Sequence, residues 1–182
     1  MSITELAPAK LNLTLDVGAR RPDGYHEITS VMQSAALYDV VTLETVETDD
    51  IVVECPGTDL PTGPDNLAWK AADVFFQETN ILHTGIFIRL EKKIPSQAGL
   101  GGGSSDAASV LRGMRRLFST NVSDEALEAM AARVGSDVPY CVRGGTALAR
   151  GRGERLTALS PLPMCWFVIV KPPVAHSTAV MF

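Results

Sequence analysis

Alternation of apolar and polar positions predicts that the front of the chain is rich in β-strands. Leu11, Leu13 and Leu15 alternate with polar residues inside a segment from Ile3 to Asp16, so we expect a strand with one buried face there. Three further extended segments are expected at Glu27 to Leu37, Val40 to Glu47 and Ile51 to Glu54. A loop rich in proline and glycine, from Pro56 to Pro64, closes this β-rich region.

Helical and strand patterns are mixed in the rest of the chain. An apolar stripe at helical spacing follows Asp65 and Asn66, either of which can cap the helix. Ile86, Ile88 and Leu90 alternate as in a half-buried strand. The other expected elements are a helix from about Ser104, a helix from Ser123 to Gly135, a glycine-interrupted strand over Val142 to Arg150 and a buried strand over Cys165 to Val170.

The segment from Pro95 to Asp106 has the composition of a loop that binds phosphate. It connects the strand that contains Leu90 to the helix expected from about Ser104. Backbone N–H groups at the start of a helix bind anions, and Ser104 and Ser105 add hydroxyls for a phosphate or for a metal bound to it. Four glycines remove side chains that would keep the backbone from a ligand, and they permit positive φ angles: Gly99, Gly101, Gly102 and Gly103.

A flexible glycine and serine linker is the alternative interpretation of this segment. Ordered patterns flank it tightly on both sides, which favours a binding loop over a linker. It is not a Walker A loop, because no lysine follows the glycines, and its glycine spacing does not fit the Rossmann fingerprint.

Composition indicates one globular domain, or one domain and part of another. Of the 182 residues, 46% are hydrophobic and 20% charged, which excludes general disorder, and no apolar stretch is long enough to span a bilayer. The net charge of −5 argues against a dedicated nucleic-acid binder. No signal peptide is recognised, and Cys55, Cys141 and Cys165 are odd in number and widely spaced, so we expect a cytoplasmic protein with reduced thiols.

Four polar residues outside the loop are candidates for chemistry, and each also has a structural interpretation. Lys10 and Asn12 point to the same side of the first strand, where they are interpretable as solvated residues. His26 follows a turn from Arg20 to Gly24, where a histidine is more often structural or exposed. Asp137 lies between a helix end and a proline, where a carboxylate commonly acts as a cap.

Four motifs together resemble the GHMP small-molecule kinases. They are Ala7 to Leu13, Asp23 to His26, Ile94 to Ala108 and Gly135 to Pro139. The glycine-rich motif indicates only the superfamily, whereas the first two motifs are most similar to the branch that acts on a diphosphocytidyl-methylerythritol alcohol. The resemblance covers essentially the whole chain. It implies the α+β fold of a GHMP N-terminal domain, similar to domain 2 of ribosomal protein S5, with a mixed β-sheet packed against helices.

The resemblance implies an ATP-dependent kinase of the non-mevalonate isoprenoid pathway, with Mg²⁺ as cofactor. By motif, Asp137 accepts the proton of the attacking hydroxyl, and Lys10 lies against Asp137 and the transferring phosphoryl group. Phosphoryl transfer needs mainly positioning and charge neutralisation, which agrees with these residue types. No metal ligand is assigned.

The resemblance also implies binding residues. Those implied for the cytidyl substrate are Asn12, Tyr25, His26 and Phe182, with the Phe182 ring against the cytosine. Those implied for the ATP phosphates are Pro95, Ser96, Gln97, Ala98, Gly99, Leu100, Gly101, Gly102, Gly103, Ser104 and Ser105. Those implied near the adenine are Asn66, Leu67 and Lys92. Lys92 and Lys93 are equally interpretable as solvated residues at a strand end.

Family members are longer than 182 residues, so the resemblance implies a domain division. Residues 1–158 correspond to the N-terminal ATP-binding domain, and residues 159–182 to the beginning of a truncated C-terminal α/β domain. We expect a monomer or homodimer that binds ATP and a cytidine diphosphate derivative, without nucleic-acid or membrane partners. Two alternatives stay open: a non-catalytic nucleotide-binding fragment or paralogue, and a GHMP kinase that acts on homoserine, mevalonate or a sugar.

Overall fold

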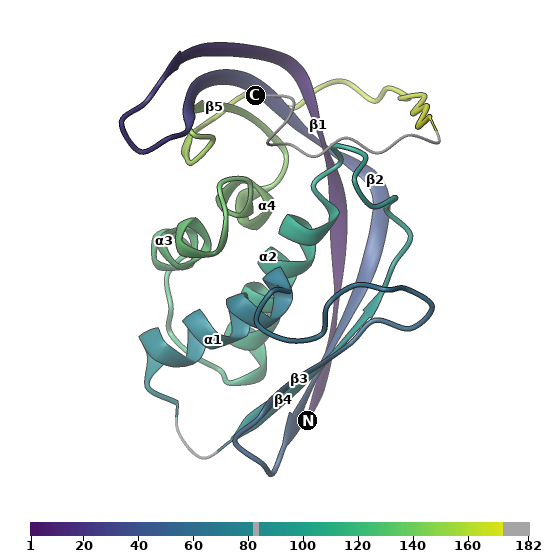
Figure 1. The fold of residues 1–182 in the computed structure, drawn as a ribbon, viewed down its shortest axis with the longest axis vertical. Coiled ribbons are helices and arrows are strands. Elements are labelled where there is room, and N and C mark those ends of the chain that lie inside the picture. Colours follow the sequence, from purple (N-terminus) through teal and green to yellow (C-terminus); the bar gives the residue numbers. More distant parts are fainter. Residues whose placement is uncertain (82–83, 173–182) are drawn as a thin grey trace.

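Six strands form one mixed sheet in residues 1–81 and 84–172, which are the part of the chain that the computed structural model describes. Helices cover one face of this sheet (Figure 1). The predicted α+β fold, a mixed sheet packed against helices, is confirmed.

The strands are arranged around one long antiparallel pair, β1 (Ser2–Arg20) and β2 (His26–Val46). β4 (Gly85–Glu91) and β5 (Thr146–Gly151) both pair with the edge of β2 that faces away from β1. β3 (Ile51–Glu54) runs parallel to β4, and β6 (Arg155–Ala158) runs antiparallel to β5. Since β4 pairs with residues 40–46 of β2 and β5 with residues 28–33, β2 changes partner between residues 33 and 40.

The helices begin at the caps that their sequences suggest. The side chain of Asn66 accepts a hydrogen bond from the Ala68 N–H and caps α1 (Leu67–Thr79), and Ser123 caps α3 (Asp124–Val134) in the same way through the Ala126 N–H. The other helices are α2 (Gly102–Leu117) and the short α4 (Val138–Arg143). The largest core side chains between helices and sheet include Met32, Leu43, Phe75, Ile86, Ile88, Leu90, Leu111, Met114 and Leu127.

Several element boundaries differ from the sequence-based expectation. β2 is one continuous strand where two extended segments were expected, and β6 was not expected. The strand expected over residues 142–150 begins only at Thr146, because residues 138–143 form α4. Helices of six residues carry too short an apolar pattern to be recognised from periodicity.

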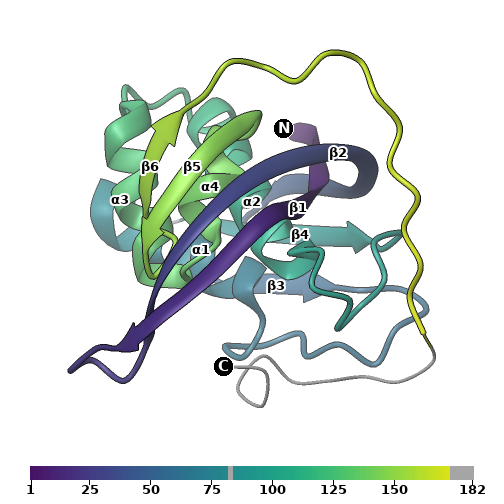
Figure 2. The ribbon, with the colours of Figure 1, turned by 90° about the horizontal axis from the view of Figure 1, so that it is seen from above.

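The expected buried face of the first strand is wrong beyond Leu11. Ala7 and Ala9 are fully buried, whereas Leu13 and Leu15 are 37% and 47% exposed. Here β1 and β2 continue as a ribbon that extends past the helices (Figure 2), so no helix covers these leucines. Alternation predicted the strand correctly, but not the layer that packs against it.

The buried strand expected over Cys165 to Val170 is also wrong. Residues 159–172 form no helix or strand, and Trp166 and Val168 are 93% and 92% exposed. A strand needs a neighbour for its backbone hydrogen bonds, and within the described ranges none pairs with this segment. β6 ends at Ala158, where the first predicted domain ends, and the assignment of residues 159–182 to a second domain stays a prediction.

In the described residues, no helix combines the length and the apolar character that crossing a bilayer requires.

Close packing of α2 on the sheet gives a prediction about Gly113. A Cβ added there would lie 2.2 Å from Leu43 Cδ1 and 3.3 Å from Glu5 Cγ. Glycine to alanine in a helix interior normally stabilises by about 1 kcal/mol, but overpacking costs about 1–3 kcal/mol. We therefore expect Gly113→Ala to lower the free energy of unfolding, measured by urea denaturation.

The matched control is Gly63→Ala, because an added Cβ at Gly63 meets nothing within 4 Å. Its unfolding midpoint should stay near that of the unmodified protein. A Gly113→Ala variant as stable as this control would contradict the packing described here.

Candidate active site

The glycine-rich loop leads directly into the first turn of α2. Gly101 is the N-cap residue with a left-handed φ of 65°, and α2 begins at Gly102, inside the glycine run. No side chain caps the helix, so the N–H groups of its first turn are available to a ligand. With a helix of 16 residues behind them, these groups have the arrangement that favours the binding of an anion such as phosphate.

Lys10 of β1 crosses this loop at Gly101. Its backbone N–H donates to the Leu100 carbonyl at 2.9 Å, and a Cβ added to Gly101 would lie 2.6 Å from Lys10 Cγ. Leu100 of the loop packs with Ala9 and Ile94 in a small apolar cluster that is separate from the main core. Gly101 therefore has two reasons to be glycine: its positive φ and the lysine stem that occupies the space of a side chain.

The ammonium group of Lys10 joins two of the candidate residues. Its Nζ lies 3.1 Å from Asp137 Oδ2 and donates to Asn12 Oδ1 at 2.6 Å. Asn12 in turn donates from Nδ2 to Ser30 Oγ at 2.7 Å. The structure thus brings Lys10 and Asp137 together beside the loop, although 127 positions separate them in the chain.

Asp137 occupies a cap position but does not act as a cap. It is the residue before α4, and its side chain makes no hydrogen bond to the helix N–H groups. The side chain is 31% exposed, so one part of the carboxylate faces Lys10 while access from solvent remains. A purely local capping role is therefore excluded in this structure.

Two side chains hold α4, and with it Asp137, against the sheet. Arg112 of α2 donates to the Cys141 carbonyl at 2.7 Å and to the Leu6 carbonyl of β1 at 3.3 Å. Tyr140 donates its hydroxyl proton to the Gly145 carbonyl at 2.7 Å, and burial raises the pKa of this phenol to about 12. Asp137 thus precedes a helix that is bonded to β1, to α2 and to Gly145, the residue before β5.

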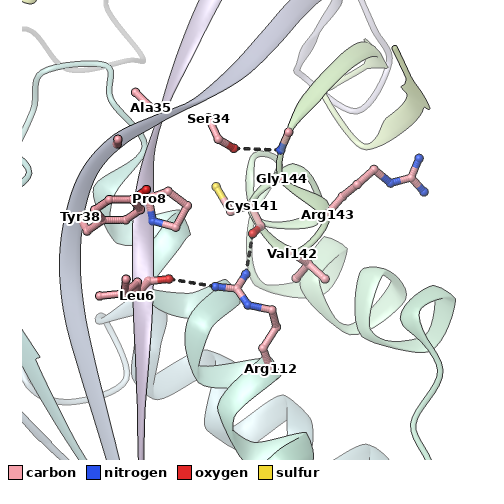
Figure 3. Close-up of a pocket in the computed structure, with 12 residues that line it drawn as sticks. Leu6, Pro8, Ser34, Ala35, Tyr38, Arg112, Cys141, Val142, Arg143 and Gly144 are labelled. Carbon is pink, nitrogen blue, oxygen red and sulfur yellow. Dashed lines mark hydrogen bonds between the residues drawn. The ribbon is translucent and has the colours of Figure 1, made fainter. Parts of the chain in front are cut away.

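A pocket of about 510 Å³ opens between the β1–β2 pair and α4 (Figure 3). It contains none of the residues that the sequence analysis selected. Arg112, its central charged group, already donates to two carbonyls, as the dashed lines in Figure 3 show. We therefore regard the pocket as part of the packing around α4 and assign no ligand to it.

The turn between β5 and β6 links Tyr25 to the neighbourhood of Asp137. The Arg152 guanidinium lies 4.8 Å from the centroid of the Tyr25 ring. A Cβ added to the next residue, Gly153, would lie 3.6 Å from Asp137 Oδ1. Tyr25 is 51% exposed, and the buried Nδ1 of His26 has no hydrogen-bond partner in the described part of the chain.

Of the residues implied near the adenine, Asn66 is engaged in hydrogen bonds within the protein, and Leu67 lies beside the loop. The Asn66 side chain accepts from the Ala68 N–H at 2.8 Å and donates to the Pro61 carbonyl at 2.7 Å, so both ends of its amide are in use. Leu67 does border the loop, because a Cβ added to Gly103 would lie 3.7 Å from Leu67 Cδ1.

Lys92 lies in a buried ion-pair cluster rather than at a solvated strand end. Its ammonium group pairs with Asp39 of β2 and Asp106 of α2, and its side chain is only 9% exposed. Burial disfavours the ammonium ion, but the two carboxylates outweigh this effect and raise the pKa of Lys92. Burial likewise raises the pKa of Asp106 to about 7, against the opposing charge of Lys92.

Sequence reasoning gave no role to Asp39, Asp106 or Arg152. Asp39 lies 53 positions from Lys92, and the alternation pattern marked it only as a break between two extended segments. Phe182, the fourth residue implied for the substrate, lies outside the described residues.

Comparison with known proteins identifies the domain. Residues 66–145 match the family model for the GHMP kinases N terminal domain. The chain is 47% identical over 182 residues to the 4-diphosphocytidyl-2-C-methyl-D-erythritol kinase of Enterococcus faecalis and 45% identical to that of Bacillus subtilis, over the whole of this chain in both cases. A crystal structure of a 4-(cytidine 5'-diphospho)-2C-methyl-D-erythritol kinase is 42% identical and covers 88% of this chain and 56% of its own, with a TM-score of 0.74.

Residues 66–145 thus match a GHMP kinase N-terminal domain. The chain spans about 64% and 63% of the lengths of the two curated relatives. The matched residues include the glycine-rich loop and Asp137, whereas Lys10, Asn12 and Tyr25 precede residue 66. The Lys10–Asp137 ion pair therefore joins the matched segment to the β1–β2 pair.

The contact between the loop of the GHMP domain and Lys10 gives a prediction about two glycines. Gly99 and Gly101 both have positive φ, at 71° and 65°, but a Cβ added to Gly99 meets nothing within 4 Å. Alanine at either position costs about 1–2 kcal/mol for the left-handed backbone. We expect Gly101→Ala to lower the free energy of unfolding by a further margin of about 1–3 kcal/mol, because its Cβ also collides with the Lys10 stem.

Gly99→Ala is therefore the matched control, and urea denaturation of both variants measures the difference. Equal losses of stability in the two variants would mean that Lys10 does not cross the loop at Gly101.

Proposed function

We propose that this protein is an ATP-dependent kinase that phosphorylates the 2-hydroxyl group of 4-diphosphocytidyl-2-C-methyl-D-erythritol. The observation that carries the proposal is the Lys10–Asp137 ion pair, held beside an anion-binding helix start by the contact with Gly101. A carboxylate, a fixed cation and converging N–H groups are the equipment that phosphoryl transfer requires.

Each part of the site has a role in this proposal. The N–H groups at the start of α2 bind the ATP phosphates, and Asp137 accepts the proton as the substrate hydroxyl attacks the γ-phosphorus. Lys10 neutralises charge on the transferring group and orients the Asp137 carboxylate, from 3.1 Å away. The nucleotide leaves as ADP, and the proton passes from Asp137 to solvent through its exposed side.

Magnesium bound to ATP supplies additional neutralisation of phosphate charge. The described residues contain no group of three or more His, Cys, Asp or Glu side chains that converges as a metal site. Mg²⁺ commonly keeps several waters and relies on substrate phosphates, so this arrangement fits an ion that arrives with ATP. The buried Ser105 hydroxyl has no partner in the described ranges and is an oxygen donor of the loop for phosphate or metal.

Tyr25, His26 and Asn12 are the proposed contacts of the cytidyl substrate. The exposed Tyr25 ring is suited to stacking on a base, and the unpartnered His26 Nδ1 is suited to a hydrogen bond. The proposed role of Phe182 concerns a residue outside the described part of the chain. Abundant ATP and three free cysteines suit the cytoplasm that we propose as the location.

Two alternatives are less well supported. A nucleotide-binding module without activity would need neither the Lys10–Asp137 pair nor the Asn12 contact that accompanies it. A kinase of homoserine, mevalonate or a sugar is disfavoured because relatives 45–47% identical to the whole chain are named for the diphosphocytidyl alcohol.

We predict that the intact protein, given ATP and Mg²⁺, releases ADP with 4-diphosphocytidyl-2-C-methyl-D-erythritol and not with homoserine, mevalonate or galactose. In the same assay Asp137→Asn should lower kcat by about 10²–10⁴-fold, because the positioned base is lost, while both KM values change little.

Asp59→Asn, the same chemical change in an exposed loop, is the control and should retain full activity. ADP release with another of the alcohols only would overturn the substrate. An Asp137→Asn variant with near-normal kcat would remove Asp137 from the role of base.

A further inference from the structure

The cluster of Asp39, Lys92 and Asp106 lies at both ends of the glycine-rich loop. Lys92 lies three residues before Pro95, where the loop begins. Asp106 lies at the other end of the loop, in α2, and its carboxylate pairs with the Lys92 ammonium group. Asp39 of β2 pairs with the same ammonium group. The three side chains therefore connect the entrance of the loop, its exit and the central strand of the sheet.

Asp39 also binds the backbone at the loop entrance. Its Oδ1 accepts hydrogen bonds from the N–H groups of Lys93 and Ile94, the latter at 2.8 Å, while its Oδ2 accepts from Lys92 Nζ. The residue is 0% exposed, and these three hydrogen bonds all lead to residues 92–94. A carboxylate that accepts several N–H bonds without exposure to water is a strong and directional anchor.

The same carboxylate packs against the first residue of α2. A Cβ added to Gly102 would lie 3.5 Å from Asp39 Oδ2 and 3.2 Å from Ile94 Cγ2. The start of the helix whose N–H groups face the ligand thus rests on Asp39 and on the segment that Asp39 holds. Asp39 lies where β2 changes partner from β5 to β4, so this anchor stands on a fixed point of the sheet.

The charges of Asp39, Lys92 and Asp106 affect how readily an anion binds at the start of α2. Two carboxylates close to the start of α2 would repel a phosphate, but Lys92 neutralises one charge, and Asp39 and Asp106 share the same ammonium group. Burial raises the pKa of Asp106 to about 7, which reduces the negative charge that it carries near neutral pH.

We propose that Asp39 is a positioning residue for the nucleotide: together with Lys92 it clamps the two ends of the glycine-rich loop so that the helix start is held ready for the ATP phosphates. This inference rests on the proposed function, because it names ATP as the ligand of the loop. It assigns Asp39 no contact with substrate. Its effect passes through the backbone of residues 93–94 and through Lys92.

Asp39→Asn in the intact protein tests the inference. Asparagine keeps the volume, and its amide oxygen can still accept from the N–H groups of Lys93 and Ile94, but its N–H₂ group then faces the Lys92 ammonium in place of a carboxylate oxygen. We expect the KM and the equilibrium Kd for ATP to rise by about tenfold or more, as for loss of a charge-assisted bond, while the KM for the alcohol substrate stays constant. The ATP Kd is measured by calorimetry and both KM values by ADP release.

Two further variants keep the test decisive if Asp39→Asn does not fold. Asp106→Asn mimics a neutral carboxyl group and breaks only the connection at the loop exit, so a smaller rise in the ATP Kd is expected with the fold retained. Asp49→Asn, the same change in the exposed turn after β2, is the matched control and should change neither constant.

A lower melting temperature with an unchanged ATP Kd in both Asp39→Asn and Asp106→Asn would overturn the inference, since the cluster would then be structural only. Equal rises in the KM of ATP and of the alcohol would overturn it too. If the unmodified protein bound no ATP, the proposed function itself would fall, which separates the two failures.

Discussion

The structure of the site depends on the passage of the Lys10 stem over Gly101. This contact determines how closely the glycine-rich loop packs against β1. It also directs the lysine ammonium group toward Asp137. A side chain at Gly101 would fill the space that the lysine uses, and a backbone with negative φ would turn the loop away. One close approach therefore places the start of α2, a lysine and a carboxylate side by side.

Other elements serve to keep that alignment. Arg112 bonds α4 to β1, and Tyr140 bonds α4 to Gly145, just before β5, so that Asp137 is held next to Lys10. The Asp39–Lys92 ion pair connects strand β2 to the start of the glycine-rich loop. The proposed phosphoryl transfer would depend mostly on the positions and charges of a few groups, which is what these contacts fix.

Local chemistry explains which features were predictable from the sequence. The loop, the helix starts near Asn66 and Ser123 and the strand with Ile86 and Ile88 are determined by residues near one another in the chain, and all were predicted. The exposure of Leu13 was not, because it depends on which helices reach the β1–β2 ribbon. Partners distant in the chain were equally hidden: motifs suggested that Lys10 meets Asp137, but no pattern suggested that Asp39 meets Lys92.

The central claim is that Lys10 and Asp137 act as one unit beside the loop, and a double-mutant cycle on kcat tests it most directly. The variants are Lys10→Met, Asp137→Asn and the two combined, in the intact protein with saturating ATP and alcohol substrate. If the residues form one unit, the double variant loses little more activity than the more damaging single variant. A loss equal to the product of the two single losses would contradict the account, because each residue would then act independently of the other.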